Sequence, residues 1–282
     1  FSARDRDHDG RMDTWLHYGE GGALVREERD RTGDGLADTW TEITGTQASE
    51  RREDRNADGR ADVVTRYADG QPLRQEEDSN LDGQPDRFTD YEAGVARRIE
   101  QDRNHDGQRD ARAEFDAGGT KTAERQDEDH DGTFEIAILY ADGVRSRVEE
   151  DTRGDGQADL VVVYAPSPAG GESPPGILRR EVDSDGDGRF ESVAHFEGGN
   201  ERTRHLDADG DGFSEIMAWV LPGGEVEREA IDSDGSGRHD VTRHYAGGQP
   251  SRDERDADGD GRPERITLYS LDVPDRIVQE QA

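Results

Sequence analysis

A nine-residue acidic motif recurs eleven times in this 282-residue chain and constrains its fold more than any other feature. One copy, at residues 127–135, reads DEDHDGTFE. Oxygen-bearing side chains stand at the first, fifth and ninth positions of every copy and at the third position of nearly every copy, and the sixth residue is always Gly. This alternation bends a short loop around a hard cation and directs oxygen atoms towards it. The motif therefore predicts a repeated calcium loop.

The motif copies divide residues 1–282 into one array of eleven units. Successive copies start 24 or 25 residues apart, except for a gap of 32 residues before the eighth copy. The eight extra residues fall in a Pro-, Gly- and Ser-rich stretch, residues 165–176, which we interpret as an insertion within one array. The first residues of the copies are Asp5, Asp30, Asp54, Asp78, Asp102, Asp127, Asp151, Asp183, Asp207, Asp232 and Asp256.

The composition explains why such a chain would need a cation. The sequence has 69 Asp and Glu against 36 Lys and Arg, a formal net charge of -33, and only 29% hydrophobic residues. Such a chain buries too little apolar surface to offset the entropy lost on folding. One divalent ion in each of eleven loops would add +22 and change the net charge from -33 to about -11. We expect these ions to supply stability that a core does not.

A strand, a tight turn and a return strand are expected after each motif copy. Residues 14–18, 136–140 and 160–164 are rich in β-branched and aromatic side chains, which is typical of strands. Dipeptides such as Asp69-Gly70 suit a tight hairpin turn, whose two central residues need positive φ. Sustained helical spacing of apolar residues does not occur. We therefore predict an all-β fold, an elongated array of eleven antiparallel β-hairpins linked by calcium loops.

Two side-chain rows are expected on this sheet. Arg and Glu stand two residues apart in return strands, as in Arg74 and Glu76, so both point to one face and can form a ladder of ion pairs. The last residue of the first strand is aromatic in nine of eleven units, which we interpret as a structural row packed from unit to unit. Its members are Tyr18, Tyr67, Tyr91, Phe115, Tyr140, Tyr164, Phe196, Tyr245 and Tyr269.

The motif resembles two known kinds of calcium loop. Its first six positions resemble an EF-hand loop, but the flanking helices and the position-twelve Glu of that family are missing. As a nine-residue loop between antiparallel strands, it resembles the calcium loops of the integrin α-subunit β-propeller, including the carboxylate at position nine. This resemblance covers the loop in all eleven units and implies calcium ligands. It also implies an alternative fold, a β-propeller.

The expected calcium ligands are the side chains at positions one, three, five and nine, together with the carbonyl of position seven, which in the first loop is Arg11. Magnesium, which needs a tighter octahedron, is the second choice. The residues are Asp5, Asp7, Asp9, Arg11, Asp13, Asp30, Thr32, Asp34, Asp38, Asp54, Asn56, Asp58, Asp62, Asp78, Asn80, Asp82, Asp86, Asp102, Asn104, Asp106, Asp110, Asp127, Asp129, Asp131, Glu135, Asp151, Asp155, Asp159, Asp183, Asp185, Asp187, Glu191, Asp207, Asp209, Asp211, Glu215, Asp232, Asp234, Ser236, Asp240, Asp256, Asp258, Asp260 and Glu264.

Three loops depart from the acidic pattern. Thr32 at position three and Ser236 at position five can still offer a hydroxyl oxygen, whereas Arg153 at position three brings a positive charge. We therefore predict that the Asp151 loop is the weakest metal site. Position four is His in three loops, and we interpret these residues as exposed and without a metal role: His8, His105 and His130.

The sequence favours a structural function outside the cell. No nucleophile paired with a base and no phosphate-binding loop is recognisable, so we expect no enzyme activity. A net charge of -33 disfavours binding to nucleic acid and to anionic membranes. The sequence contains no run of about 18 apolar residues, so we do not expect insertion into a membrane. We expect an extracellular or cell-surface stalk, matrix component or filament subunit, with cell-surface or matrix partners. The alternative is a calcium-dependent adhesion or ligand-binding module, propeller or lectin-like.

Calcium and the two ends of the array suggest how the protein would assemble. The chain is expected to be unfolded at cytosolic calcium and to fold outside the cell, where calcium is millimolar. Because the sequence begins at Phe1, we interpret it as a processed product or a fragment from which any signal peptide is gone. Residues 1–4 resemble the end of a strand and residues 276–280 a return strand with no loop after it. We expect these ends to pair head to tail between copies and to build a filament.

Overall fold

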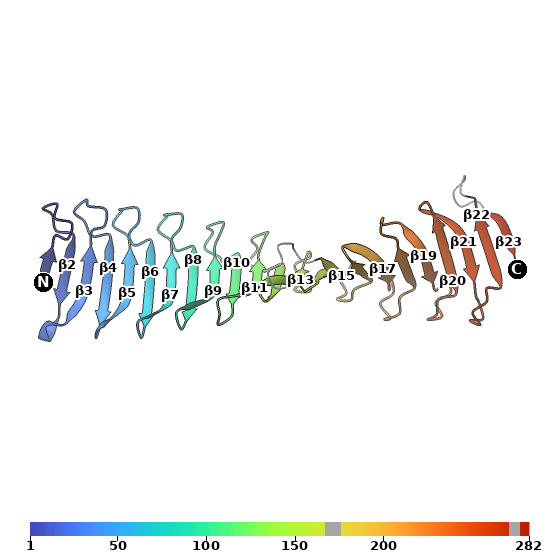
Figure 1. The fold of residues 1–282 in the computed structure, drawn as a ribbon, viewed down its shortest axis with the longest axis horizontal. Helices are drawn as coiled ribbons and strands as arrows, with labels where there is room; N and C mark the ends of the chain where they lie inside the picture. Colours follow the sequence, from blue (N-terminus) through green and yellow to red (C-terminus); the bar gives the residue numbers. More distant parts are fainter. Residues whose placement is uncertain (167–175, 271–276, 282) are drawn as a thin grey trace. The chain divides into compact units, whose positions relative to one another are not determined.

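A computed structural model describes residues 1–166, 176–270 and, for the backbone only, 277–281. Its regular structure consists of strands β1 to β23 and one short 3-10 turn, η1, at Glu20–Gly22 (Figure 1). The chain divides into two compact units, Phe1–Phe134 and Glu135–Ala282. Within these described ranges, no helix is long and apolar enough to cross a membrane.

The first unit contains eleven strands. They are β1 (Ser2–Arg4), β2 (Thr14–Tyr18), β3 (Leu24–Arg29), β4 (Thr39–Thr44), β5 (Gln47–Glu53), β6 (Val63–Ala68), β7 (Gln71–Glu77), β8 (Arg87–Glu92), β9 (Val95–Gln101), β10 (Ala111–Phe115) and β11 (Lys121–Gln126). The second unit contains the remaining strands. They are β12 (Ile136–Ala141), β13 (Val144–Glu150), β14 (Leu160–Tyr164), β15 (Ile177–Val182), β16 (Ser192–Glu197), β17 (Asn200–Leu206), β18 (Ile216–Val220), β19 (Val226–Ile231), β20 (Val241–Ala246), β21 (Gln249–Arg255), β22 (Arg265–Tyr269) and β23 (Ile277–Gln281).

Each unit is one open row of antiparallel strands. Strands β1 to β11 pair in sequence order in the first unit, and β12 to β23 do so in the second. This confirms the all-β array of hairpins. The alternative of a β-propeller is wrong, because a propeller divides its strands among separate four-stranded blades.

Acidic loops and tight turns lie at opposite edges of each row, because they alternate along an antiparallel chain (Figure 1). The Asp-Gly turns have the predicted conformation. Asp69 and Gly70 have φ angles of 51° and 75°, and Asp142 and Gly143 have φ angles of 51° and 76°. Positive φ at both central residues matches the twist of the flanking strands and fixes their register.

The Pro-rich stretch at 165–176 belongs to one hairpin of the second unit. Strands β14 and β15 on either side of it pair directly, and the N–H of Ala165 donates to the carbonyl of Gly176 at 2.8 Å. Residues 167–175 lie outside the described part of the chain. The stretch thus lengthens one turn without interrupting the row of strands.

A β-bulge that was not predicted from the sequence directly precedes the aromatic-row position of the first strand in each hairpin. In the β6–β7 pair, Arg66 lies opposite Arg74 but Tyr67 lies opposite Pro72, which leaves Leu73 as the extra residue. The same shift of register occurs in the other ten hairpins. Because a bulge increases local twist, the array repeats one distortion per hairpin.

A continuous ladder of ion pairs crosses one face of the first unit, as predicted. The N···O distances between successive members range from 2.5 to 3.9 Å. Exposed pairs contribute about 0 to 1 kcal/mol each, so the ladder mainly fixes register and neutralises charge. In order, its members are Glu28, Arg26, Glu42, Arg52, Glu50, Arg66, Glu76, Arg74, Asp90, Arg98, Glu100 and Arg112.

One local apolar cluster of the second unit lies on a single face of the sheet. In the second unit Ile138, Val148 and Val162 form a buried cluster, and Tyr140 and Tyr164 of the aromatic row pack against it. These side chains come from three adjacent strands of a single layer, so no second layer covers them within the described residues. The contacts of both tyrosines agree with a structural role for the row.

Two other members of the aromatic row reach back to the preceding hairpin. The Tyr245 hydroxyl donates to Glu229 Oε2 at 2.6 Å, and the Tyr269 hydroxyl donates to Asp253 Oδ2 at 2.8 Å. Burial, followed by the hydrogen bond to Glu229, raises the pKa of Tyr245 to about 12. These two tyrosines therefore bind their hairpins to the preceding ones.

The raised pKa of Tyr245 predicts that alkaline pH destabilises the second unit. An unfolded tyrosine ionises near pH 10, so the contribution of Tyr245 to the free energy of unfolding is fully present below about pH 10. It is lost as the pH rises towards the folded pKa of about 12. Because burial and the bond to Asp253 also raise the pKa of Tyr269, the late titration step in tyrosinate absorbance should become smaller in Tyr245→Phe and keep its amplitude in the control Tyr164→Phe. A late step of unchanged amplitude in Tyr245→Phe would contradict this assignment.

Candidate metal centre

Each acidic loop folds around the carboxylate of its first residue. In all eleven loops the N–H of the position-six Gly donates to one oxygen of this Asp, with N···O distances of 2.7 to 3.0 Å. In eight loops the second oxygen accepts the N–H of position four. These two bonds curl the backbone into a cradle.

The carboxylate at position nine closes the cradle. In ten loops one of its oxygens accepts the N–H of position two, at 2.6 to 2.8 Å. Several of these side chains are buried, and Asp62, Asp110 and Asp240 are only 4%, 3% and 2% exposed. The first and ninth residues therefore hold the loop from its two ends.

Backbone conformation explains the invariant Gly at position six. Its φ lies between 77° and 97° in the eleven loops, a region that side chains with a Cβ rarely adopt. Position four also has positive φ, for example 60° at Ala57 and 79° at Gly33. This second requirement was not predicted from the sequence, although Gly at position four in six loops was a signal for it.

Predicted ligand oxygens converge in several loops. In the eighth loop Asp183, Asp185, Asp187 and Glu191 each place one carboxylate oxygen within 4.8 Å of the others. The group in the first loop contains Asp5, Asp7 and Asp13 but not Asp9. These groups could hold a metal ion. Further groups of the same kind comprise Asp207, Asp209, Asp211 and Glu215; Asp256, Asp258, Asp260 and Glu264; and, in the first unit, Asp127, Asp129 and Asp131.

Three loops carry Asn at position three, and its amide joins the same cradle. Asn56 Oδ1 accepts the N–H of Asp58 at 2.9 Å, and Asn56 Nδ2 donates to Asp58 Oδ2 at 3.3 Å. Asn80 and Asn104 bond to the position-five Asp in the same way. Positions three and five are therefore adjacent in these loops too. Rotation of the amide would be needed to direct more oxygen to a cation.

Hydrogen bonds favour the ionised form of several cradle carboxylates. The pKa of Asp106 is lowered, chiefly by the N–H of Gln108 and then by the Asn104 amide. The pKa of Asp82 is lowered chiefly by the Asn80 amide. Two such charges 4.8 Å apart repel each other by about 1 kcal/mol in water and by about 3.5 kcal/mol at an effective dielectric constant of 20. A bound cation would relieve this repulsion.

Two buried carboxylate oxygens lack a hydrogen-bond partner, which indicates whether the loops suit a metal ion. Asp110 Oδ1 is buried and unpaired, while Asp110 Oδ2 accepts the N–H groups of Arg103 and Asn104 at 2.7 and 3.1 Å. Asp207 Oδ1 is also buried and unpaired. A buried acceptor without a partner is costly, and a hard cation would satisfy it. The donor set is oxygen throughout, so these residues fit calcium.

Two of the position-four histidines contact the preceding loop. His105 Nδ1 lies 3.7 Å from Asp86 Oδ2, and His130 Nδ1 lies 3.7 Å from Asp110 Oδ2. Both carboxylates occupy position nine of their loops. The position-four histidines are exposed, as predicted, and these two also contact the carboxylate that closes the preceding loop.

Backbone hydrogen bonds join successive loops. The first N–H of each loop donates to the carbonyl of position nine in the preceding loop at all ten junctions, with distances of 2.7 to 2.9 Å. At one junction, for example, the N–H of Asp54 donates to the carbonyl of Asp38 at 2.8 Å. Position nine thus closes its own loop with its side chain and holds the next loop with its backbone.

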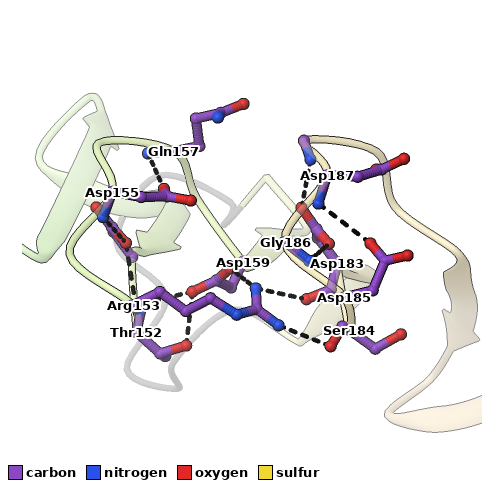
Figure 2. Close-up of polar contacts among 12 residues, drawn as sticks. Thr152, Arg153, Asp155, Gln157, Asp159, Asp183, Ser184, Asp185, Gly186 and Asp187 are labelled. Carbon is purple, nitrogen blue, oxygen red and sulfur yellow. Dashed lines mark hydrogen bonds and ion pairs between the residues drawn. The ribbon is translucent and has the colours of Figure 1, made fainter.

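Arg153 makes the seventh loop different (Figure 2). Its Nη1 donates to Oδ1 of Asp159, the ninth residue of the same loop. Its Nη2 donates to the carbonyl of Ser184, in the next loop, at 2.7 Å. This position-three side chain therefore brings no oxygen to the cradle and extends to the neighbouring loop.

Comparisons with known proteins identify no family. No protein-family model and no curated protein matches the chain. Among solved structures, it is similar to a mutant of S. aureus TarM in complex with Fondaparinux, alpha-GlcNAc-glycerol and UDP, at 10% identity over 48% of this chain and 21% of that chain, with a TM-score of 0.21. It is also similar to TcdB2-TccC3, at 13% identity over 92% and 15% of the two chains, with a TM-score of 0.24. The chain spans about a fifth or less of these proteins, and the TM-scores are too low to support an argument.

Replacing Gly59 with Ala should destabilise the third loop. Gly59 has a φ of 88° with open space around it, so the cost is conformational, about 1 to 2 kcal/mol. Ala57→Gly is the matched control, because Ala57 already has a φ of 60° and Gly removes a cost there. Urea unfolding should show a lower midpoint for Gly59→Ala and an equal or higher midpoint for Ala57→Gly. Equal losses in both variants would refute this interpretation.

Proposed function

We propose that the chain is a calcium-dependent structural repeat protein of the cell surface or extracellular space. The cradle around the first Asp carries the proposal, because its geometry recurs in all eleven loops. The clustered carboxylates and the unpaired Asp110 oxygen give this cradle an affinity for a hard cation. Calcium is preferred because it accepts six to eight oxygen ligands at flexible angles.

The thin sheet supports calcium as a structural component. With small apolar clusters and exposed ion pairs, the hairpins have little else to offset a net charge of -33. A ligand at a hundredfold excess over its dissociation constant stabilises the bound state by about 2.7 kcal/mol per site. Summed over several loops, this contribution exceeds that of any single contact described above. Millimolar calcium, as found outside cells, would keep the array folded.

Removal of calcium should therefore unfold the protein. In EDTA we expect loss of the β-sheet signal in circular dichroism, and in millimolar calcium we expect its full recovery. Magnesium at the same concentration is the control and should restore less of the signal, because it requires a tighter octahedron. An unchanged β-sheet signal in EDTA would rule out calcium-dependent folding.

We further propose that copies associate head to tail through their outermost strands. Strand β1 pairs with β2, and β23 pairs with β22, so each has one edge without a partner among the described residues. Unpaired edges present N–H and C=O groups to another strand. A contact between unlike ends does not close on itself and would propagate as a filament.

Electron microscopy in millimolar calcium should then show filaments whose length increases with protein concentration. Light scattering of the same samples provides an independent measure of mass. Monodisperse particles at all concentrations would rule out this mode of assembly and would leave a stalk or matrix component. The open sheet gives no specific support to the alternative of a ligand-binding module.

A further inference from the structure

The seventh loop contains the most distinctive polar contact in the array. Arg153 is the only basic residue at position three of the eleven motif copies. Its guanidinium group binds Asp159 of its own loop and two backbone carbonyls of the next loop, those of Ser184 and Asp183, the latter at 3.4 Å from Nη1 (Figure 2). A planar guanidinium fork suits such simultaneous contacts. The side chain thus bridges two loops that calcium would otherwise stabilise separately.

The ninth-position carboxylate of this loop has no oxygen left unpaired. Asp159 Oδ2 accepts the N–H of Thr152 at 2.7 Å and its hydroxyl at 2.6 Å, while Oδ1 accepts the Arg153 guanidinium. Asp110, at the same position of the fifth loop, keeps Oδ1 buried and unpaired. The charge that a metal ion would supply beside Asp159 is already present as an arginine.

We propose that Arg153 replaces the metal ion of the Asp151 loop and joins this loop to the Asp183 loop without calcium. The inference rests on the proposed calcium binding of the other loops. It goes further because the contact between these two loops would not depend on calcium. Charge-assisted hydrogen bonds from the guanidinium group supply the cohesion. The backbone bond from the Asp183 N–H to the Asp159 carbonyl, at 2.8 Å, completes the joint.

Calcium stoichiometry provides the first test. Native mass spectrometry of the full chain in calcium should show one more bound ion in Arg153→Asp than in the wild type, because the loop then has carboxylates at all four ligand positions. Arg55→Asp is the matched control. Arg55 occupies position two of the third loop and pairs with Glu77 outside the cradle, so its substitution should leave the number of ions unchanged. An equal number of ions in Arg153→Asp and the wild type would overturn the proposal.

Hydrogen exchange provides a second test that does not count ions. During a calcium titration, peptides containing the Asp183 amide should become protected in the wild type at a calcium concentration about tenfold lower than in Arg153→Ala. Arg55→Ala should not change the protection of these peptides. Identical protection curves for the wild type and Arg153→Ala would overturn the proposal.

The two tests separate this inference from the proposed function. If the wild type binds no calcium but its Asp183 amide is protected only when Arg153 is present, calcium-dependent folding is wrong and the arginine joint stands. If calcium binds to the other loops but neither Arg153 variant differs from the wild type, the arginine joint is wrong and the proposed function stands.

Discussion

Repulsion between closely spaced carboxylates is the constraint on which the whole array depends. The cradle places up to four carboxylate oxygens within 4.8 Å of one another, and it does so by directing backbone N–H groups to the first and ninth residues. In the folded loop, the φ angles and these hydrogen bonds fix where the carboxylate oxygens lie. This arrangement is stable only when positive charge is near. A cation supplies that charge in most loops under our proposal, and an arginine supplies it in one.

Beyond the loops, the hairpins hold together through contacts between neighbours. The ion-pair ladder of the first unit ties each strand to the next from Glu28 to Arg112, and the second unit has the buried cluster around Val148 and the Tyr245 contact with Glu229. Each contact is small, since exposed ion pairs contribute about 0 to 1 kcal/mol. The second unit also contains ion pairs between strands, such as that of Arg243 with Asp253 at 2.9 Å, so both units are held together by many small contacts between adjacent strands.

Strands and turns were predictable from the sequence, whereas the bulges between paired strands and the contacts between adjacent loops were not. Strand β14 (Leu160–Tyr164) and the turn at Asp69-Gly70 follow from residue type and period. The bulge at Leu73 does not, because one additional residue in a polar return strand leaves no pattern. The contacts of His105 and Arg153 depend on the distance between adjacent loops, which no single motif copy encodes. The propeller alternative was wrong for the same reason, since a loop sequence specifies its own conformation but not the sheet around it.

The backbone bond that joins successive loops has a consequence for how such a protein can vary. Every junction uses the same two atoms, the N–H of position one and the carbonyl of position nine. Within a unit, a whole hairpin could be lost or duplicated between two equivalent aspartates, and the flanking junction would re-form with identical geometry. Unequal recombination within the gene would then yield proteins of different length that still fold. The length of the array can therefore evolve independently of the chemistry of its loops.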